Sequence, residues 1–343
     1  MTKLNFLSSS ILLHRFYFDL VDIVKVKEYH FYRLSLFQNS VSFEKGFRKT
    51  VFGAGFSIKS KVAFSKLKFW KSLGLLMIGF LIKKNFFDHW DNFFKIVLIN
   101  LGFITSIAFP VFIPPLLSSL PFLGAFAMLI GILWCFVYLS AAALSLKAVS
   151  DYGNFGFADF FGNLKLMWPA GLVMGAFVFI SYLLATTVIP FYLSMNSLIG
   201  LMLAAIVFWT LIIAVLALQF FFAVRSRLDS RIIPALKKCF LIFFDNPMFC
   251  IFSFFHSLVV LIVSFLLALL APGPAGILLF LDEALRLRLL KYDWLEANPD
   301  TPRSKIPWDA LLIEEREKTG SRSLKNFIFP WKDWKLYNNM LYS

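Results

Sequence analysis

Long hydrophobic runs separated by short polar connections dominate the chain from Met77 to about residue 295. A membrane-spanning helix needs about 20 consecutive, mostly apolar residues, because the hydrocarbon core of a bilayer is ~30 Å thick. Runs of this length predict spanning helices at 95–117, 120–146, 169–191, 197–224 and 248–271, and a weaker sixth at 276–295. We therefore expect an all-α, polytopic integral membrane protein of about six transmembrane helices, with additional interfacial amphipathic helices.

The polar connections alternate in charge, and this alternation predicts a topology. Connections without Lys or Arg are 110–121, 189–197 and 271–276, and basic connections are 83–95, 147–168 and 225–247. Basic loops remain preferentially in the cytoplasm, so the uncharged connections are expected outside. Both termini are then expected in the cytoplasm, which requires an even number of spans.

The sixth run is unusual because it contains charged residues. Asp282 and Glu283 follow its predicted outer end by only two turns, and charge at that depth costs several kcal/mol unless it is paired or hydrated. One interpretation is a polar site inside the bundle, in which Asp282 and Arg286 form an ion pair four residues apart. The pattern favours the other interpretation, a short or tilted helix whose charges lie at the interface.

A short motif, consisting of an aromatic residue, then Asp or Gly, then Asn, precedes three of the runs. It occurs as Trp90-Asp91-Asn92, Phe161-Gly162-Asn163 and Phe244-Asp245-Asn246. We interpret each copy as a joint where an interfacial helix turns into a spanning helix, with Asp or Asn capping the new helix. Pro169 and Pro247 would then lie near helix starts. The uneven spacing leaves chance similarity as the alternative.

Composition supports a membrane protein and argues against a nucleic-acid-binding protein. The 343 residues are 59% hydrophobic with a mean hydropathy of +0.75, and only 16% are charged, against about 25% in a typical soluble domain. The net charge is +14, of which residues 1–76 supply nine; in the hydrophobic region the basic residues flank the hydrophobic runs, which suits anionic lipid headgroups. The cysteines and histidines have no metal-site spacing, so we expect neither metal nor cofactor.

The two ends of the chain differ from the hydrophobic region 77–295. Residues 1–76 are basic and lack a spanning run, which predicts a poorly ordered or loosely interfacial extension. The alternative is that Met77 is the true start and the preceding residues are translated upstream sequence. Residues 296–343 are expected to form a cytoplasmic tail with one short helix, capped by Asp309.

Six polar residues in or near the runs are candidates for function. They are Asn100, Gln219, His256, Asp282, Glu283 and Arg286. Uncharged polar groups in a bilayer commonly hydrogen-bond between helices, whereas His256 can also titrate near neutral pH. No nucleophile or metalloprotease motif occurs, so we expect no enzymatic activity.

Three segments of the region 77–295 carry a resemblance to a known family: "KKNFFDHWDNFFKIVLINLGF", "FGNLKLMWPAGL" and "IPALKKCFLIFFDNP". In their layout they resemble the YesL-like family of bacterial multi-pass membrane proteins. The resemblance implies a location in the bacterial inner membrane, frequent genetic association with sugar-uptake transporters, and no known catalytic residue. We therefore expect an accessory protein of a solute-uptake or envelope system, with the bilayer and other membrane subunits as partners. The alternative is a permease subunit with a polar path near Asp282, Glu283, Arg286 and His256.

Overall fold

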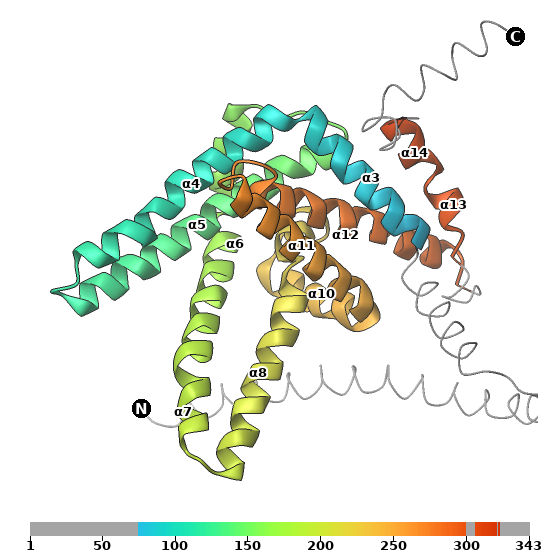
Figure 1. The fold of residues 1–343 in the computed structure, drawn as a ribbon. Coiled ribbons are helices and arrows are strands. Elements are labelled where there is room, and N and C mark those ends of the chain that lie inside the picture. The colour runs from blue at the N-terminus through green and yellow to red at the C-terminus, as the bar shows by residue number, and fades with distance from the viewer. Residues whose placement is uncertain (1–74, 300–305, 321, 323–343) are drawn as a thin grey trace, which may run out of the picture. The chain divides into compact units, whose positions relative to one another are not determined.

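The computed structural model describes residues 75–299, 306–320 and 322, and all regular structure within these residues is helical (Figure 1). They belong to one unit of the chain, Trp70–Ser343. The N-terminal extension expected for residues 1–76 lies almost wholly outside the described residues. Most of the predicted tail lies outside them as well.

The expected all-α membrane architecture is confirmed. The helices are α3 (Leu75–Asp91), α4 (Phe93–Leu116), α5 (Pro121–Ser150), α6 (Phe157–Leu183), the π-helical segment η1 (Leu184–Val188), α7 (Ile189–Ser194), α8 (Leu198–Leu218), α9 (Phe221–Arg227), α10 (Ile232–Asp245), α11 (Pro247–Leu266), α12 (Gly273–Ala297), α13 (Trp308–Leu311) and α14 (Ile313–Thr319). By length and composition, five described segments could cross a membrane: Phe93–Leu116, Pro121–Ser150, Phe157–Ser194, Leu198–Arg227 and Pro247–Leu266. These segments overlap the first five predicted spans.

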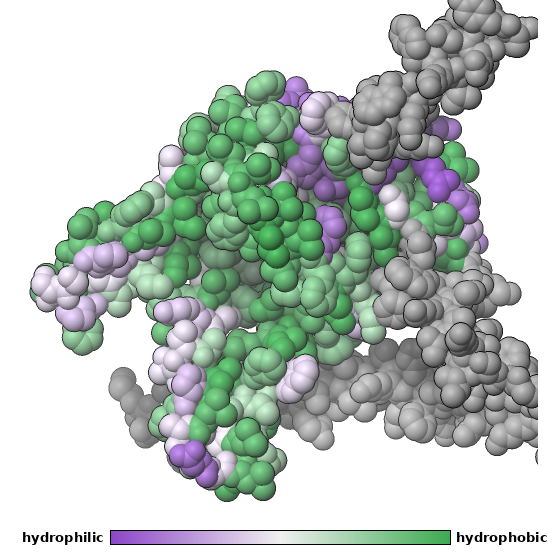
Figure 2. All heavy atoms as spheres, in the orientation of Figure 1, coloured by the Kyte–Doolittle hydropathy of each residue, from purple (hydrophilic) through white to green (hydrophobic). Residues whose placement is uncertain are grey.

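Two long helical hairpins extend from a common base (Figure 1). One contains α4 and α5, and the other contains α6 to α8. Helices α5 and α6 approach closely because Gly171 has no side chain: a Cβ there would collide with the backbone of Val137. Close approach at small residues is typical of helix packing in membranes. On the visible face, hydrophobic residues cover both hairpins, and hydrophilic residues gather near α3 (Figure 2).

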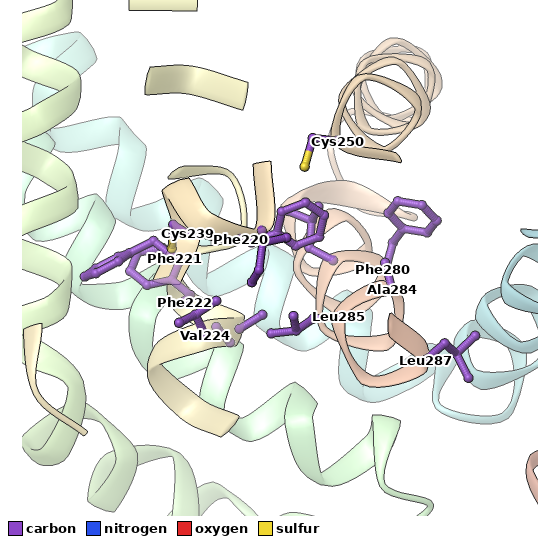
Figure 3. Close-up of a cluster of buried hydrophobic side chains, with 14 of the residues drawn as sticks. Phe220, Phe221, Phe222, Val224, Cys239, Cys250, Phe280, Ala284, Leu285 and Leu287 are labelled. Carbon is purple, nitrogen blue, oxygen red and sulfur yellow. The ribbon is translucent and has the colours of Figure 1, made fainter. Parts of the chain in front are cut away.

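The base contains a buried hydrophobic core built from the ends of several helices (Figure 3). Phe220 stacks on Phe249 with ring centroids 5.7 Å apart, which joins the α8–α9 turn to α11. Cys239 of α10 and Cys250 of α11 are buried in the same cluster as Phe280 of α12. This core fixes α12 against the shorter helices at the base of the hairpins.

The sixth predicted run forms a helix, α12, but it is not among the segments that are long and apolar enough to cross a membrane. The turn that precedes it lies against α4, because the side chain of Asn100 donates to the carbonyls of Leu270 and Pro272 at 3.0 and 2.8 Å. Helix α4 continues for sixteen residues beyond Asn100, or about 24 Å, before it ends at Leu116.

The contacts of α12 with α5 place the α11–α12 turn at the same level along the α4–α5 hairpin. Ala275 and Leu279 of α12 share a buried cluster with Ala142 and Leu146 of α5, near the end of α5. Helix α5 begins about 30 Å earlier, at Pro121. The α11–α12 turn therefore lies well short of the α4–α5 turn along these helices.

The three predicted joints have different outcomes. Asn92 separates α3 from α4, and Asn246 separates α10 from α11, so two joints lie where one helix ends and another begins. Neither Asn caps the next helix through its side chain. The joint predicted at Phe161-Gly162-Asn163 is wrong, because these residues lie inside the continuous helix α6.

The predicted proline positions and tail helix need similar corrections. Pro247 is the first residue of α11, as predicted, whereas Pro169 lies inside α6. The single helix predicted in the tail is two short helices, α13 and α14, which are separated at Leu312. Asp309 lies in the first turn of α13 and accepts a hydrogen bond from Arg316 instead of capping the helix.

Candidate functional site

The charged residues of α12 lie in a largely buried polar network at the base of the hairpins. Asp282 is 2% exposed and Glu283 is 0% exposed. The partners of Asp282, Glu283 and Arg286 come from α3, from the end of α5, from α9 and from α14. Because charge is costly to bury, the partners of each group decide what the network can do.

Arg227, the last residue of α9, binds the first of these carboxylates. Its Nε donates to Asp282 at 2.9 Å, and its Nη2 also reaches the same carboxylate. Its remaining donors bind Asp151 at 2.9 Å and the Ser150 hydroxyl at 3.0 Å, just after α5. The ion pair predicted between Asp282 and Arg286 is therefore wrong, since the Asp282 carboxylate is bound by a different arginine.

Arg286 instead joins the end of α5 to α14. It donates to the Ser150 carbonyl at 2.8 Å, to the Asp151 carboxylate, and to Glu315 at 2.7 and 3.2 Å. Tyr152 also binds Glu315, at 2.9 Å. The guanidinium groups of Arg227 and Arg286 thus share Asp151 and hold four helices together, namely α5, α9, α12 and α14.

Glu283 lies in the most enclosed part of the network, against α3. It accepts a hydrogen bond from the Asn85 amide at 3.0 Å, and the Lys84 ammonium is 3.9 Å from its other oxygen. Lys84, which is 0% exposed, forms an ion pair with Asp88 and lies 3.9 Å from the ring centroid of Tyr152. One ammonium group therefore serves two carboxyl groups and an aromatic ring.

The network contains more acidic than basic groups. Its carboxyl groups are Asp88, Asp151, Asp282, Glu283 and Glu315, and its basic groups are Lys84, Arg227 and Arg286, with Lys147 at its edge. Burial raises the pKa of the Asp282 carboxyl, although its hydrogen bonds from Arg227 act in the opposite direction. Burial raises the pKa of Glu283 well above its ordinary value, and the charge of Lys84 offsets this only in part.

The uncharged candidates have mainly structural partners. Asn100 is buried, and besides its two donated bonds it accepts one from the backbone of Ala275 at 2.9 Å. Gln219 donates to the carbonyls of Leu216 and Cys250 at 2.8 and 2.9 Å, across the α8–α11 contact. These contacts agree with hydrogen bonding between helices.

His256 lies apart from the ion pairs, stacked on Phe280 of α12 with ring centroids 3.8 Å apart. Its Nδ1 has no hydrogen-bond partner within the described part of the chain. The same is true of Nε2 of His89, which lies against Gly276, one turn before Phe280 on α12. The two histidines, from α3 and α11, therefore lie against neighbouring turns of α12, the helix that carries Glu283.

The candidate joint residues have polar roles that differ from capping. Asp91 forms a two-bond ion pair with Arg322 at 2.8 Å, and Asn92 bonds back to the Asp88 carbonyl at 3.1 Å. Asn163 donates to the Ser145 hydroxyl at 2.9 Å, which links α6 to α5. The aromatic members Trp90, Phe161 and Phe244 are each more than half exposed.

The joint at Phe244-Asp245-Asn246 belongs to a second, smaller polar cluster. Asn246 donates to the Tyr292 hydroxyl at 2.7 Å and accepts from the Lys291 ammonium at 3.0 Å. Both Lys291 and Tyr292 also bind Asp245. This cluster fixes the α10–α11 junction to the second half of α12.

Several network residues were not among the sequence candidates: Lys84, Asn85, Asp88, Asp151, Tyr152, Arg227 and Glu315. One signal was available, because Lys84 and Asp88 are four residues apart on an amphipathic helix, the spacing of an ion pair. Asn85 lies inside α3 next to this pair, and Asp151, Tyr152, Arg227 and Glu315 come from helix ends and from the tail. Their spacing in the sequence indicates nothing about proximity.

Within the described ranges, no group of three or more His, Cys, Asp or Glu side chains could hold a metal ion. The carboxyl groups of the network can bind protons, and its ion pairs fasten helices together. No protein-family model, curated protein or solved structure matches the chain.

Proposed function

We propose that this chain is a non-enzymatic, multi-pass protein of the bacterial inner membrane, acting as an accessory subunit of a solute-uptake or envelope system. The observation that carries this proposal is that the charged groups of Asp282 and Arg286 on α12 are bound by other residues of the same chain. These contacts leave both groups poorly suited to binding a solute. The layout resemblance to the YesL-like family supports the same role.

The exposed surface of the second hairpin suits contact with lipid or with a membrane-embedded partner subunit. Helix α8 exposes large apolar side chains along its length: Leu198, Ile199, Leu201, Met202, Ile206 and Trp209. Apolar patches of this extent on a soluble surface would promote aggregation. A bilayer, and other helices within it, remove that cost.

In the topology we propose, four segments cross the bilayer, and α11 and α12 form a hairpin that enters and leaves on the cytoplasmic side. The position of the α11–α12 turn beside Asn100 supports this arrangement. Irregular backbone is tolerated at membrane depth when protein groups satisfy it. With four crossings, both termini remain cytoplasmic, and the charges of α12 lie near the inner surface.

A proton-coupled permease subunit is the second candidate, and one observation favours it. His89 of α3 and His256 of α11 each carry a buried ring nitrogen without a partner among the described residues, and both side chains lie against α12. Titratable groups at membrane depth often mark proton routes. In this candidate, the histidines and Glu283 would form the path.

Reconstitution into liposomes separates the two candidates. We expect no flux of sugars or protons from the purified protein alone, and we expect it to co-purify with a transporter subunit from native membranes. Flux that is present in the wild type and lost in His256→Ala would contradict the accessory role. Gln219→Leu, which removes a polar group from a neighbouring contact, is the matched control.

A further inference from the structure

We infer that Glu283 and Asp88 form a proton-binding site, in which one proton is held between the two carboxyl groups beside Lys84. The site is independent of the accessory role proposed above. It rests on the way α3 and α12 pack together, with charged groups of both helices enclosed between them.

Burial is the first part of the evidence. Lys84 and Glu283 are 0% exposed, and Asp88 and Asn85 are each 7% exposed. At this depth water cannot compensate an unpaired charge, and a second negative charge near the first is strongly unfavourable. A neutral carboxyl group avoids that cost.

The balance of charge is the second part. The groups around Glu283 are Lys84 and Asp88 of α3, with the Tyr152 ring on Lys84. The nearby arginines of the network do not correct the balance, because Arg227 binds Asp282 and Asp151, and Arg286 binds Asp151 and Glu315. Two carboxyl groups and one ammonium group carry a net charge of −1 unless one proton is added.

Hydrogen bonding identifies the oxygen that carries the proton. Oε2 of Glu283 accepts from the Asn85 amide, whereas Oε1 has no hydrogen-bond partner within the described residues. A proton on Oε1 turns this oxygen into a donor, and the Asp88 carboxylate is an acceptor. Asp88 also accepts from Lys84, which places the ammonium group on the Asp88 side of the pair.

A metal ion fits this site less well than a proton. The Lys84 ammonium already occupies the cationic position between the carboxyl groups, and the Asn85 amide presents its NH₂ to Glu283. Hard cations require several oxygen ligands and repel an ammonium group at close range. The ligand is therefore a proton, the smallest cation available.

A carboxyl group whose pKa is raised by folding makes the stability of the folded protein depend on pH in a defined direction. An unfolded chain releases the Glu proton near its ordinary pKa of about 4.3, whereas the buried Glu283 retains it to a higher pH. Between these two values the folded state binds more protons, so stability is highest at the acidic side and falls as pH rises. Glu283→Gln imitates the protonated group and should remove this dependence.

Infrared spectroscopy of the purified full-length protein in detergent tests the site directly. We expect the carbonyl band of a protonated carboxyl group at neutral pH, its loss in Glu283→Gln, and its retention in the control Glu314→Gln, which changes an exposed residue of α14. The absence of this band in the wild type, or its persistence in Glu283→Gln, overturns the proposal.

Two further measurements address a variant that does not fold and a site that binds a cation other than a proton. If Glu283→Gln does not fold, the band is followed in Asp88→Asn. This change leaves one carboxyl group beside the Lys84 ammonium, so Glu283 should ionise and the band should be lost; a band that persists unshifted contradicts a shared proton. Sodium added at constant pH should leave the wild-type band unchanged. Loss of the band on addition of sodium would identify a cation site instead of a proton site.

Discussion

At the scale of single residues, Asn100 shows how one amide closes a turn among packed helices. It donates to two carbonyls of the α11–α12 turn and accepts from the backbone N–H of Ala275 in the first turn of α12. Gly273 permits this contact, because its φ of +63° is in the left-handed region and a Cβ there would collide with the Asn100 amide. The turn and the amide therefore depend on each other.

Asn100→Ala should destabilise the protein more than a comparable change elsewhere on α4. It removes the hydrogen bonds of the Leu270 carbonyl and of the buried Ala275 N–H, each at a cost of about 1–3 kcal/mol, whereas the Pro272 carbonyl keeps its bond from the Gly276 N–H at 3.0 Å. The expected result is a lower midpoint of thermal unfolding in detergent. Thr105→Ala is the matched control, since Thr105 is exposed and bonds only to its own helix at Gly102. Equal midpoints for the two variants would contradict the role given to Asn100.

At the scale of elements, α14 is held on the base through Glu315. This buried carboxylate accepts hydrogen bonds from Arg286 and Tyr152, and the Thr319 hydroxyl bonds to its backbone carbonyl. The helix has only seven residues, so it has little stability of its own. Its position depends on these contacts and on the buried Leu312 beside it.

Glu315→Ala should release α14, because removal of one partner from a buried ion pair typically costs about 3–5 kcal/mol. We expect faster amide hydrogen exchange in residues 313–319, with little change in α5. Glu314→Ala removes an exposed carboxylate one residue away and serves as the control. Equal exchange in both variants would show that α14 is held by other contacts.

The elements also show what the sequence could predict. Hydrophobic runs located the five long segments because length and apolarity follow directly from bilayer thickness. The motif at Phe161 failed because an aromatic–Gly–Asn sequence is compatible with the interior of a helix when Asn163 finds a partner on α5. The partners of Asp282 could not be predicted, since Arg227 is 55 residues away and only the fold brings them together.

At the scale of the whole molecule, the depth of the α11–α12 turn decides the topology. The sequence predicted this turn outside, because it lacks basic residues. Its hydrogen bonds to Asn100 give a different reason for the absence of charge: the backbone of the turn packs against α4. An uncharged turn is thus compatible with either depth, and the contacts of α12 with the end of α5 favour the shallower one.

Cysteine labelling in intact cells tests this topology. In a background where Cys135, Cys239 and Cys250 are replaced by Ala, we expect Ser118→Cys in the α4–α5 turn to react with a membrane-impermeant maleimide. Leu267→Cys in the α11–α12 turn, which is equally exposed in the isolated chain, should not react from outside. Asn196→Cys in the α7–α8 turn is the positive control. Labelling of Leu267→Cys as strongly as Ser118→Cys would place its turn outside and give an additional crossing at α11.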